Sequence, residues 1–448
     1  MLLGTLPDHR KLALTIPATP LHNLPIQPSR WRHIVYAYAG LLAAGAGVVW
    51  LVESSASFLD ALFLTISAIT LTGISPIPFD DLDSATRAVL AALIMASATV
   101  AIVFCMVVVL LPKRSVSDRM QWRLCRGVFG LLVCTSVIGG LALLACHGLR
   151  GTLPDPSIHL FNACSSLCGA GFSTTSAGTH SVMDTFVLTV LIGLGTFGWP
   201  AILVRFGWVR HRDGLGERLN IATRNLIKII IVATIVLAIG RLMPLCYGWL
   251  GLGQTSNNAN GSMTGVGTGL MMLFESSSIV VNSMTCGLSH QSLFGGNESM
   301  GPGTDVMIIG LMLIGGGLGS ASGGGVILVM ALVLRFIRTR GCVDLEREAT
   351  LIRNFARVFA VWVVTVIAAV VFTAAIHDGR HSVTMAICAV TNNRWPVPID
   401  FQFTESAKVQ LIVWMVVGRL LSLWCLCAVV GYWVSCLDTS SRKTNSPL

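Results

Sequence analysis

The sequence predicts an all-α polytopic membrane protein with eight transmembrane helices and four re-entrant pore helices, arranged as four pseudo-symmetric helix–pore–helix repeats. The chain has 448 residues, of which 54% are hydrophobic and only 11% are charged, whereas soluble globular domains carry about 25% charged residues. Apolar runs of about 20 residues, the length that crosses a bilayer, recur along the chain. Four times, a short apolar segment rich in small residues lies between two such runs.

The elements can be placed in order along the chain. The paired spans are expected at 34–52 and 87–111, 127–148 and 182–206, 225–247 and 304–336, and 355–376 and 408–436. The short segments between them are expected at 56–70, 157–172, 265–288 and 381–394. They are too short to cross a bilayer, and non-helical backbone at membrane depth must be buried in protein or line an aqueous path. The domains are therefore an arm at 1–33, repeats at 34–112, 113–210, 211–340 and 341–437, and a tail at 438–448.

The charges separate by the side of the membrane. The arm, the tail and the three linkers between repeats hold 23 of the 30 Lys/Arg and 8 of the 21 Asp/Glu. Basic loops stay cytoplasmic, so these five segments and both termini are expected inside. This distribution explains the net charge of +9 as membrane orientation and argues against nucleic-acid binding. It also argues against inverted-repeat carriers, in which one half is flipped.

The short segments end in four candidate filter strands. Glycine suits such a turn because it reaches backbone angles closed to other residues, and backbone carbonyls at such turns can replace the water shell of a cation. In the fourth strand Asn393 takes the glycine position, and asparagine is the next-best residue for a left-handed backbone. Aligned on this position, the strands are Thr70-Leu71-Thr72-Gly73, Cys168-Gly169-Ala170-Gly171, Met284-Thr285-Cys286-Gly287 and Val390-Thr391-Asn392-Asn393.

Two further features lie at membrane depth. Arg419 interrupts an apolar span, where a charge costs at least about 2.5 kcal/mol and usually faces a cavity or a partner. Arg419 is interpreted in one of two ways: as a barrier to cations, or as a structural partner of helix-end carbonyls or of Glu275. Glu275 is expected to open the third pore segment. The span at 304–336 is broken by glycines that a helix tolerates poorly, which indicates either a gating loop or a plain break: Gly315, Gly316, Gly317, Gly319, Gly323, Gly324 and Gly325.

These motifs resemble the ion-conducting subunit of the Trk/Ktr/HKT potassium transporter superfamily, and the KtrB type is similar in length. The resemblance rests on the strand ending in Gly73, on Gly169-Ala170-Gly171-Phe172, on the glycine run and on Gly418-Arg419-Leu420. It implies potassium, with sodium as a second possible ion, at the filter residues, and a gate made of the glycine run and Arg419. It further implies a homodimer on cytoplasmic nucleotide-binding regulatory subunits, in a plasma membrane such as the bacterial inner membrane.

Other functions are left as alternatives. A gradient-coupled carrier of a small solute or of sodium would need buried charges in several spans, and only Arg419 is clearly placed so. A non-conducting member of the superfamily would explain the missing glycine of the fourth filter. No constellation of catalytic residues supports an enzyme, and no organic cofactor is expected. The 13 cysteines show no metal-ligand spacing and are interpreted as small buried apolar residues.

Overall fold

The computed structural model is all-helical over the residues that it describes, as the sequence predicts. The first group of helices, named repeat 1, consists of α1 (Pro28–Val52), α2 (Phe58–Thr70) and α3 (Ser84–Leu110), with a 3-10 turn, η2 (Phe79–Asp81), before α3. The described residues are 28–110, 118–150, 155–172, 182–197, 199, 202, 224, 226–239, 266–285, 302–316, 345–376, 380–393 and 403–443.

Three further groups follow along the chain. Repeat 2 consists of α4 (Asp118–Gly148), α5 (Pro156–Cys168) and α6 (Val182–Thr196). Repeat 3 contains the helix Leu226–Ile239, α9 (Val266–Thr285) and α10 (Pro302–Ile314). Repeat 4 consists of α12 (Leu345–Ile376), α13 (Arg380–Thr391) and α14 (Glu405–Lys443). In repeats 1, 2 and 4 the short middle helix contacts both longer helices, which also contact each other.

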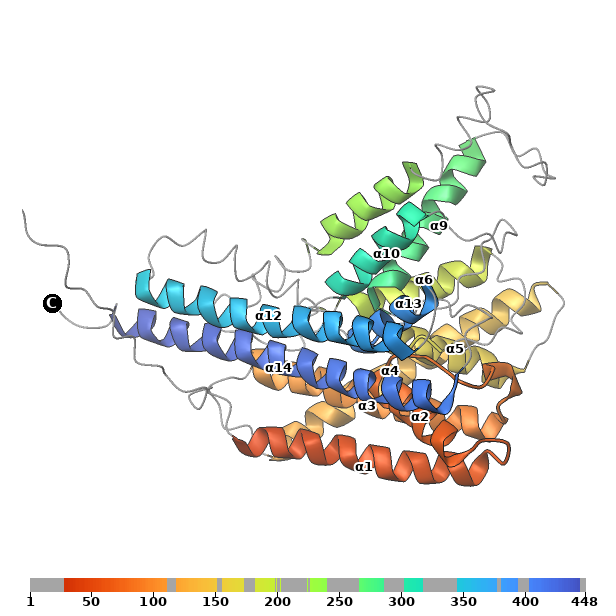
Figure 1. The fold of residues 1–448 in the computed structure, drawn as a ribbon. Helices are drawn as coiled ribbons and strands as arrows, with labels where there is room; N and C mark the ends of the chain where they lie inside the picture. The colour runs from red at the N-terminus through yellow and green to blue at the C-terminus, as the bar shows by residue number, and fades with distance from the viewer. Residues whose placement is uncertain are drawn as a thin grey trace, which may run out of the picture.

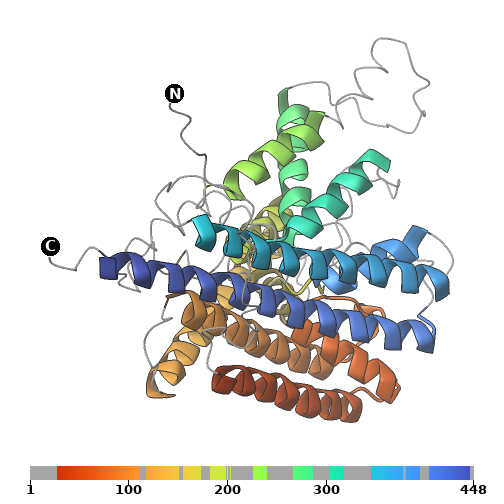
Figure 2. The ribbon, with the colours of Figure 1, turned by 60° about the vertical axis from the view of Figure 1, so that its left-hand side comes forward.

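The four groups contact one another in a closed ring. Helix α3 packs on α4 and α5, α6 packs on α9, α10 packs on α13, and α14 packs on α2 and α3. Each group therefore touches the group before it and the group after it, and the fourth touches the first. Figures 1 and 2 show the long helices α12 and α14 side by side and roughly parallel to α1.

Four of the described helices are long and apolar enough to cross a bilayer. They cover Ser84–Met106, Trp122–Gly148, Ala356–Ala375 and Glu405–Cys425. The first is 72% buried inside the protein and the third only 22%, so α3 is a central helix and α12 a peripheral one. The peripheral helix exposes Val361, Val364, Ile367 and Val371, an apolar surface of the kind that faces lipid. The chain is thus a multi-pass membrane protein.

Side chains at the helix starts explain where the short helices begin. Ser57 caps α2 in a capping box with Asp60, since the Asp60 N–H donates to Ser57 Oγ at 3.1 Å and the Ser57 N–H to Asp60 Oδ2 at 3.4 Å. Asp155 caps α5, accepting from the Ser157 N–H at 2.9 Å, and Pro156 occupies the first helical position, where no N–H is needed.

Several observed helices extend beyond the spans expected for them, and one residue lies elsewhere in its helix than expected. Helix α1 begins at Pro28 and not after residue 33, because a proline is well tolerated in the first turn. Helix α14 continues to Lys443, into the segment expected as a tail. Helix α9 begins at Val266, so Glu275 lies in its middle, fully buried, and does not open it. The expectation that Glu275 opens the third pore segment is therefore wrong.

Candidate functional site

The three short helices whose following residues the structure describes, α2, α5 and α13, all end in the same hydrogen-bonded turn. At the end of α2, the Leu71 N–H donates to Ala68 O and the Thr72 N–H to Ser67 O. The corresponding bonds run from Gly169 and Ala170 at the end of α5, and from Asn392 and Asn393 at the end of α13. This pattern is the Schellman motif, in which the first residue past the helix takes a left-handed conformation. That residue is Leu71, Gly169 or Asn392, with φ of 60°, 66° and 49°.

The shared turn corrects the predicted register of the fourth strand. Asn393 was aligned with Gly73 and Gly171, whose φ values are 75° and 76°. In the structure the left-handed residue is Asn392, and Asn393 has no positive φ. Its N–H bonds to Cys388 O, just as the Thr72 N–H bonds to Ser67 O. Asn393 therefore corresponds to Thr72, one position earlier than expected, and the glycine position falls on residue 394, outside the described residues.

A small residue of the following long helix packs against each of these three helix ends. The Ser97 hydroxyl of α3 donates to the carbonyl of Ile69. A Cβ added at Gly195 of α6 would collide with the carbonyl oxygen of Leu167, and one at Gly418 of α14 would lie 2.7 Å from the carbonyl carbon of Val390. In all three repeats the pair is 28 residues apart. This constant spacing independently supports the corrected register.

Two contacts join repeat 2 to its neighbours at this level. A Cβ at Gly73 would lie 2.6 Å from the carbonyl carbon of Gly171 and closer still to the Ala170 oxygen. The first two strands therefore touch backbone to backbone, which only glycine permits at this position. On the other side, Thr196 Oγ1 of α6 lies 2.9 Å from Thr285 Oγ1 at the end of α9.

Two contacts join repeat 4 to its neighbours. The side-chain amide of Asn393 donates to the carbonyl of Ser283 in α9 at 2.5 Å. The side-chain amide of Asn392 donates to Thr72 Oγ1 in the first strand at 3.1 Å. At this level the repeats are thus linked in the order 1, 2, 3, 4 and back to 1, with the link from repeat 2 to repeat 3 made by Thr196 of α6. The sequence predicts four such ends but not the side chains that join them.

Part of the predicted site lies outside the described residues. The third strand is described only as far as Met284 and Thr285, and Cys286 and Gly287 lie beyond it. Helix α10 ends at Ile314, where Gly315 takes a φ of 70°, so the helix stops where the glycine run begins. Gly316 is described as a bend. The remaining predicted gate residues, Gly317, Gly319, Gly323, Gly324 and Gly325, lie outside the described residues.

Arg419 is held inside the protein and directly follows the glycine that packs on α13. Its side chain is 4% exposed, and its Nη2 donates to the hydroxyl of Tyr38 in α1 at 3.3 Å. Arg419 therefore links repeat 4 to repeat 1. At this depth a guanidinium needs such polar partners, because an unpaired charge in an apolar environment is costly.

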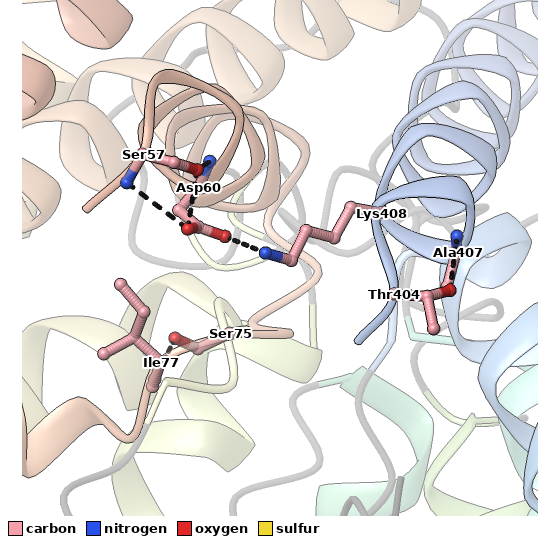
Figure 3. A network of polar contacts seen from close by, with 7 residues as sticks. All are labelled: Ser57, Asp60, Ser75, Ile77, Thr404, Ala407 and Lys408. Atoms are coloured by element: carbon pink, nitrogen blue, oxygen red, sulfur yellow. Dashed lines mark hydrogen bonds and ion pairs between the residues drawn. The ribbon is translucent and has the colours of Figure 1, made fainter. Parts of the chain in front are cut away.

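An ion pair joins the other end of α2 to α14. Lys408 Nζ lies 2.5 Å from Asp60 Oδ1, and both side chains are 14% exposed (Figure 3). Burial raises the pKa of Asp60, but hydrogen bonds from Lys408 and Ser57 and the charge of Lys408 outweigh it and leave the pKa below its ordinary value. The charged form of Asp60 is therefore the one that the fold stabilises.

The ends of α2, α5 and α13 bring carbonyl and hydroxyl oxygens, and the partial negative charge of each helix end, close together. The carbonyl end of a helix carries about half a negative charge, and the ends of α2, α5 and α13 are tied together through Thr72, Gly73 and Asn392. Carbonyl and hydroxyl oxygens without a fixed anion are typical ligands of weakly bound monovalent cations. The arrangement therefore suits a cation that passes through.

Comparison with known proteins finds a solved structure of similar fold. No family model and no curated protein matches the sequence. Among solved structures, the potassium transporter TrkH from Vibrio parahaemolyticus matches with a TM-score of 0.67 at 18% sequence identity. The match covers 91% of this chain and 85% of that one. The chain has the Trk-type fold. The superfamily resemblance predicted from the filter strands is thereby confirmed at the level of fold, and the Trk-type fold spans nearly the whole chain.

Several residues of this site escaped the sequence analysis. Ser97, Gly195 and Tyr38 carry no distinctive motif, because Ser, Gly and Tyr are ordinary residues of membrane helices. The signal that could have found the first two is their fixed distance of 28 residues from the helix-end carbonyls. In this chain the distance spans the short-helix end, the returning segment and part of the next long helix.

Proposed function

We propose that this protein takes up potassium ions across the plasma membrane through a path lined by the ends of its four short helices. The single observation that carries the proposal is the closed cycle of contacts among the four repeats at the level of the short-helix ends, in a chain whose fold matches that of a potassium transporter. Carbonyl oxygens of residues such as Thr72, Gly73 and Gly171 would replace the water shell of the ion. The protein acts in this proposal as a transporter and not as an enzyme.

The proposed filter consists of the four aligned segments, with the fourth in its corrected register. In the first repeat it comprises Thr70 to Gly73, in the second Cys168 to Gly171, and in the third Met284 to Gly287. In the fourth it comprises Thr391, Asn392 and Asn393. The proposed gate combines Arg419, which follows the contact of Gly418 with Val390, and the glycine run that begins at Gly315, where α10 ends.

The proposed setting of this transporter comes from the superfamily resemblance. Each group of three helices would be one repeat with the same orientation, so that both termini lie in the cytoplasm. The chain would act as a homodimer in a bacterial inner membrane, on cytoplasmic subunits that bind nucleotides and control the gate. Potassium is the proposed ion, with sodium as the competitor that the filter must reject.

Uptake of rubidium, a potassium substitute, tests the proposal directly. The intact protein, expressed in cells stripped of their own potassium uptake systems, should restore rubidium uptake and growth at low potassium. Gly73→Asp should abolish both, because any side chain at Gly73 collides with the second strand. Gly47→Ala is the control, since nothing lies within 4 Å of a Cβ at that position.

The outcomes separate clearly. Uptake by the intact protein and by the Gly47→Ala variant, lost in a Gly73→Asp variant that still inserts in the membrane, supports the filter. The proposal is overturned if a well-expressed intact protein shows no uptake when a regulatory subunit from its own source cell is also expressed. The result would favour another solute or a non-conducting role.

A further inference from the structure

The side chain of Asn392 connects three parts of the candidate site. Its Nδ2 donates to Thr72 Oγ1 of the first strand at 3.1 Å and to the backbone carbonyl of Met415 in α14 at 2.9 Å. A weaker contact reaches Ala389 O at 3.4 Å. Asn392 is fully buried, as is Thr72. The amide thus joins repeat 4 to repeat 1 without solvent, where a hydrogen bond is strong and its loss is costly.

The chemistry of these partners fixes which way the amide faces. Backbone carbonyls only accept hydrogen bonds, so the nitrogen of the amide, and not its oxygen, must face Met415 and Ala389. The same nitrogen faces Thr72, and the Thr72 oxygen is therefore an acceptor in this bond. An amide flipped end for end would place two acceptors against each other at Met415.

The direction of this bond determines the next two. Thr72 Oγ1 lies 2.8 Å from Thr70 Oγ1, and either atom could be the donor. Because Thr72 already accepts from Asn392, its own proton is free to go to Thr70. The Thr70 proton then goes to the carbonyl of Ile66, 2.7 Å away. The hydrogen bonds therefore run in one direction, from Asn392 through Thr72 and Thr70 to Ile66.

This chain of hydrogen bonds from Asn392 through Thr72 and Thr70 to Ile66, named the relay, affects how the two hydroxyls can bind a cation. A hydroxyl is a ligand for a cation only when its proton points elsewhere and a lone pair of its oxygen is available. In the relay both threonine protons are engaged, and each oxygen has one lone pair left. We propose that Asn392 is a positioning residue for the ion path, whose side-chain amide sets the direction of the Thr72 and Thr70 hydroxyls so that their oxygens serve a potassium ion.

The same amide connects the filter to the helix of the proposed gate. In an α-helix the carbonyl of residue i accepts from the N–H of residue i+4, so the Met415 carbonyl belongs to the turn that carries Arg419. A displacement of this turn of α14 would pull on the amide that orients Thr72. Asn392 is therefore placed to transmit the position of α14 to the first strand.

The left-handed backbone of Asn392 makes a clean substitution available. With φ of 49°, the position accepts glycine without strain, so Asn392→Gly removes the amide and keeps the turn. Thr72→Val removes the hydroxyl at nearly constant shape, and Thr72→Ser keeps the hydroxyl. Thr99→Val in α3, whose hydroxyl donates to Met95 O of the same helix at 2.7 Å, is the control for loss of a buried hydroxyl.

The test is a double-mutant cycle on rubidium uptake by the full-length protein in cells. Asn392→Gly and Thr72→Val should each raise the KM for rubidium roughly tenfold with little change in the maximal rate, and each should make sodium a stronger competitor. The double variant should be no worse than Thr72→Val alone, because Asn392 acts on the ion path through the Thr72 hydroxyl. Thr72→Ser and Thr99→Val should behave like the intact protein.

This inference rests on the proposed function, and the outcomes keep the two apart. If the intact protein takes up rubidium and Asn392→Gly leaves KM and sodium competition unchanged, the inference is overturned and the proposed function stands. Effects of the two substitutions that multiply in the double variant also overturn it. Thermal unfolding of the purified variants in rubidium and in sodium chloride provides a second measurement. An intact protein that is neither stabilised by rubidium nor able to take it up overturns both proposals.

Discussion

Lys408 of α14 forms a 2.5 Å ion pair with Asp60 in the first turn of α2 (Figure 3). Asp60 also closes the capping box with Ser57, so one carboxylate both starts the short helix of repeat 1 and fastens it to the last helix of repeat 4. The carboxylate lies at the positive end of the α2 dipole, where a negative charge is favourable. The first and last repeats are thus joined at both ends of α2: by Lys408 and Asp60 at its start, and by Asn392 and Thr72 just after its end.

Replacing Lys408 by Met should destabilise the protein modestly. The pair is only partly screened from water, with 14% exposure on each side, so its loss is expected to cost about 1 kcal/mol. Thermal unfolding of the purified protein measures the effect, and Lys408→Arg, which can keep the ion pair, is the matched control. A variant Asp60→Asn should lower stability further than Lys408→Met, since it weakens the cap as well.

Acid should remove the same contribution. The pKa of Asp60 in the folded protein lies below its ordinary value of 3.8, so the stabilisation is fully present above that value. It is lost as pH falls through the lower, folded pKa. The stability difference between the intact protein and Lys408→Met should therefore disappear in strong acid, and a difference that persists there would show that the charge of Asp60 is not its source.

A second pH dependence is expected from the contact of α4, α5 and α6. His159 is 3% exposed and its ring lies 4.5 Å from that of His147. His147 and Arg150 approach Asp184 at 3.4 and 2.7 Å. Burial lowers the pKa of His159, the charge of His147 lowers it further, and Asp184 and Asp155 oppose both effects, leaving the pKa below 6.5. The fold thus favours the neutral imidazole.

The sign of this dependence follows from linkage. The unfolded chain binds the His159 proton more readily than the folded protein, so stability is full above pH 6.5 and declines as pH falls below it. Thermal unfolding between about pH 8 and pH 5 measures the decline. His159→Gln, which stays neutral, should show a smaller decline, and an unchanged pH profile in that variant would exclude His159 as its cause.

The sequence predicted the helices well because hydropathy and segment length decide them. The expected short segments at 56–70 and 265–288 contain α2 and α9, and α5 and α13 each begin one residue before the segments expected at 157–172 and 381–394. The glycine run likewise predicted the end of α10, since Gly315 takes the positive φ that ends helices. The one-residue error in the alignment of the fourth filter strand has a different origin. Its alignment used residue type, whereas the hydrogen bonds at the helix end determine which residue is left-handed.

The contacts between repeats could not be predicted from residue types. Asn392 and Asn393 look alike in sequence, yet one amide reaches Thr72 and the other Ser283. Leu71 is buried with a φ of 60°, a conformation that costs a leucine about 1–2 kcal/mol and that local preference argues against. The Schellman hydrogen bonds at the end of α2 hold Leu71 in this left-handed conformation. These bonds are visible in the structure but not in the residue types.

Arg419 should limit the flux of the proposed transporter. If its charge lies beside the ion path, Arg419→Ala should raise rubidium uptake by roughly tenfold, the effect of a barrier lower by about 1.4 kcal/mol. Tyr38→Phe removes the hydroxyl that Arg419 contacts at 3.3 Å without removing the charge, so it should change uptake much less. Unchanged or lost uptake in a well-folded Arg419→Ala variant would instead assign Arg419 a structural role.

Gly418→Ala should disrupt the junction of α13 and α14. The added Cβ would lie 2.7 and 2.9 Å from the carbonyl carbon and Cα of Val390, both backbone atoms, so one helix must move. Such overpacking typically costs about 1–3 kcal/mol, and here the displaced helix carries Arg419 and the Met415 carbonyl that holds Asn392. We therefore expect lower thermal stability together with reduced rubidium uptake.

The matched control for Gly418→Ala is Gly310→Ala in α10. Nothing lies within 4 Å of a Cβ at Gly310, and alanine is favoured over glycine inside a helix by about 1 kcal/mol, so this variant should be as stable as the intact protein or slightly more so. Gly195→Ala in α6 should resemble Gly418→Ala, because its Cβ would meet the Leu167 carbonyl in the same way. If Gly418→Ala and Gly195→Ala both matched Gly310→Ala in stability, the close packing of the long helices on the short-helix ends would be refuted.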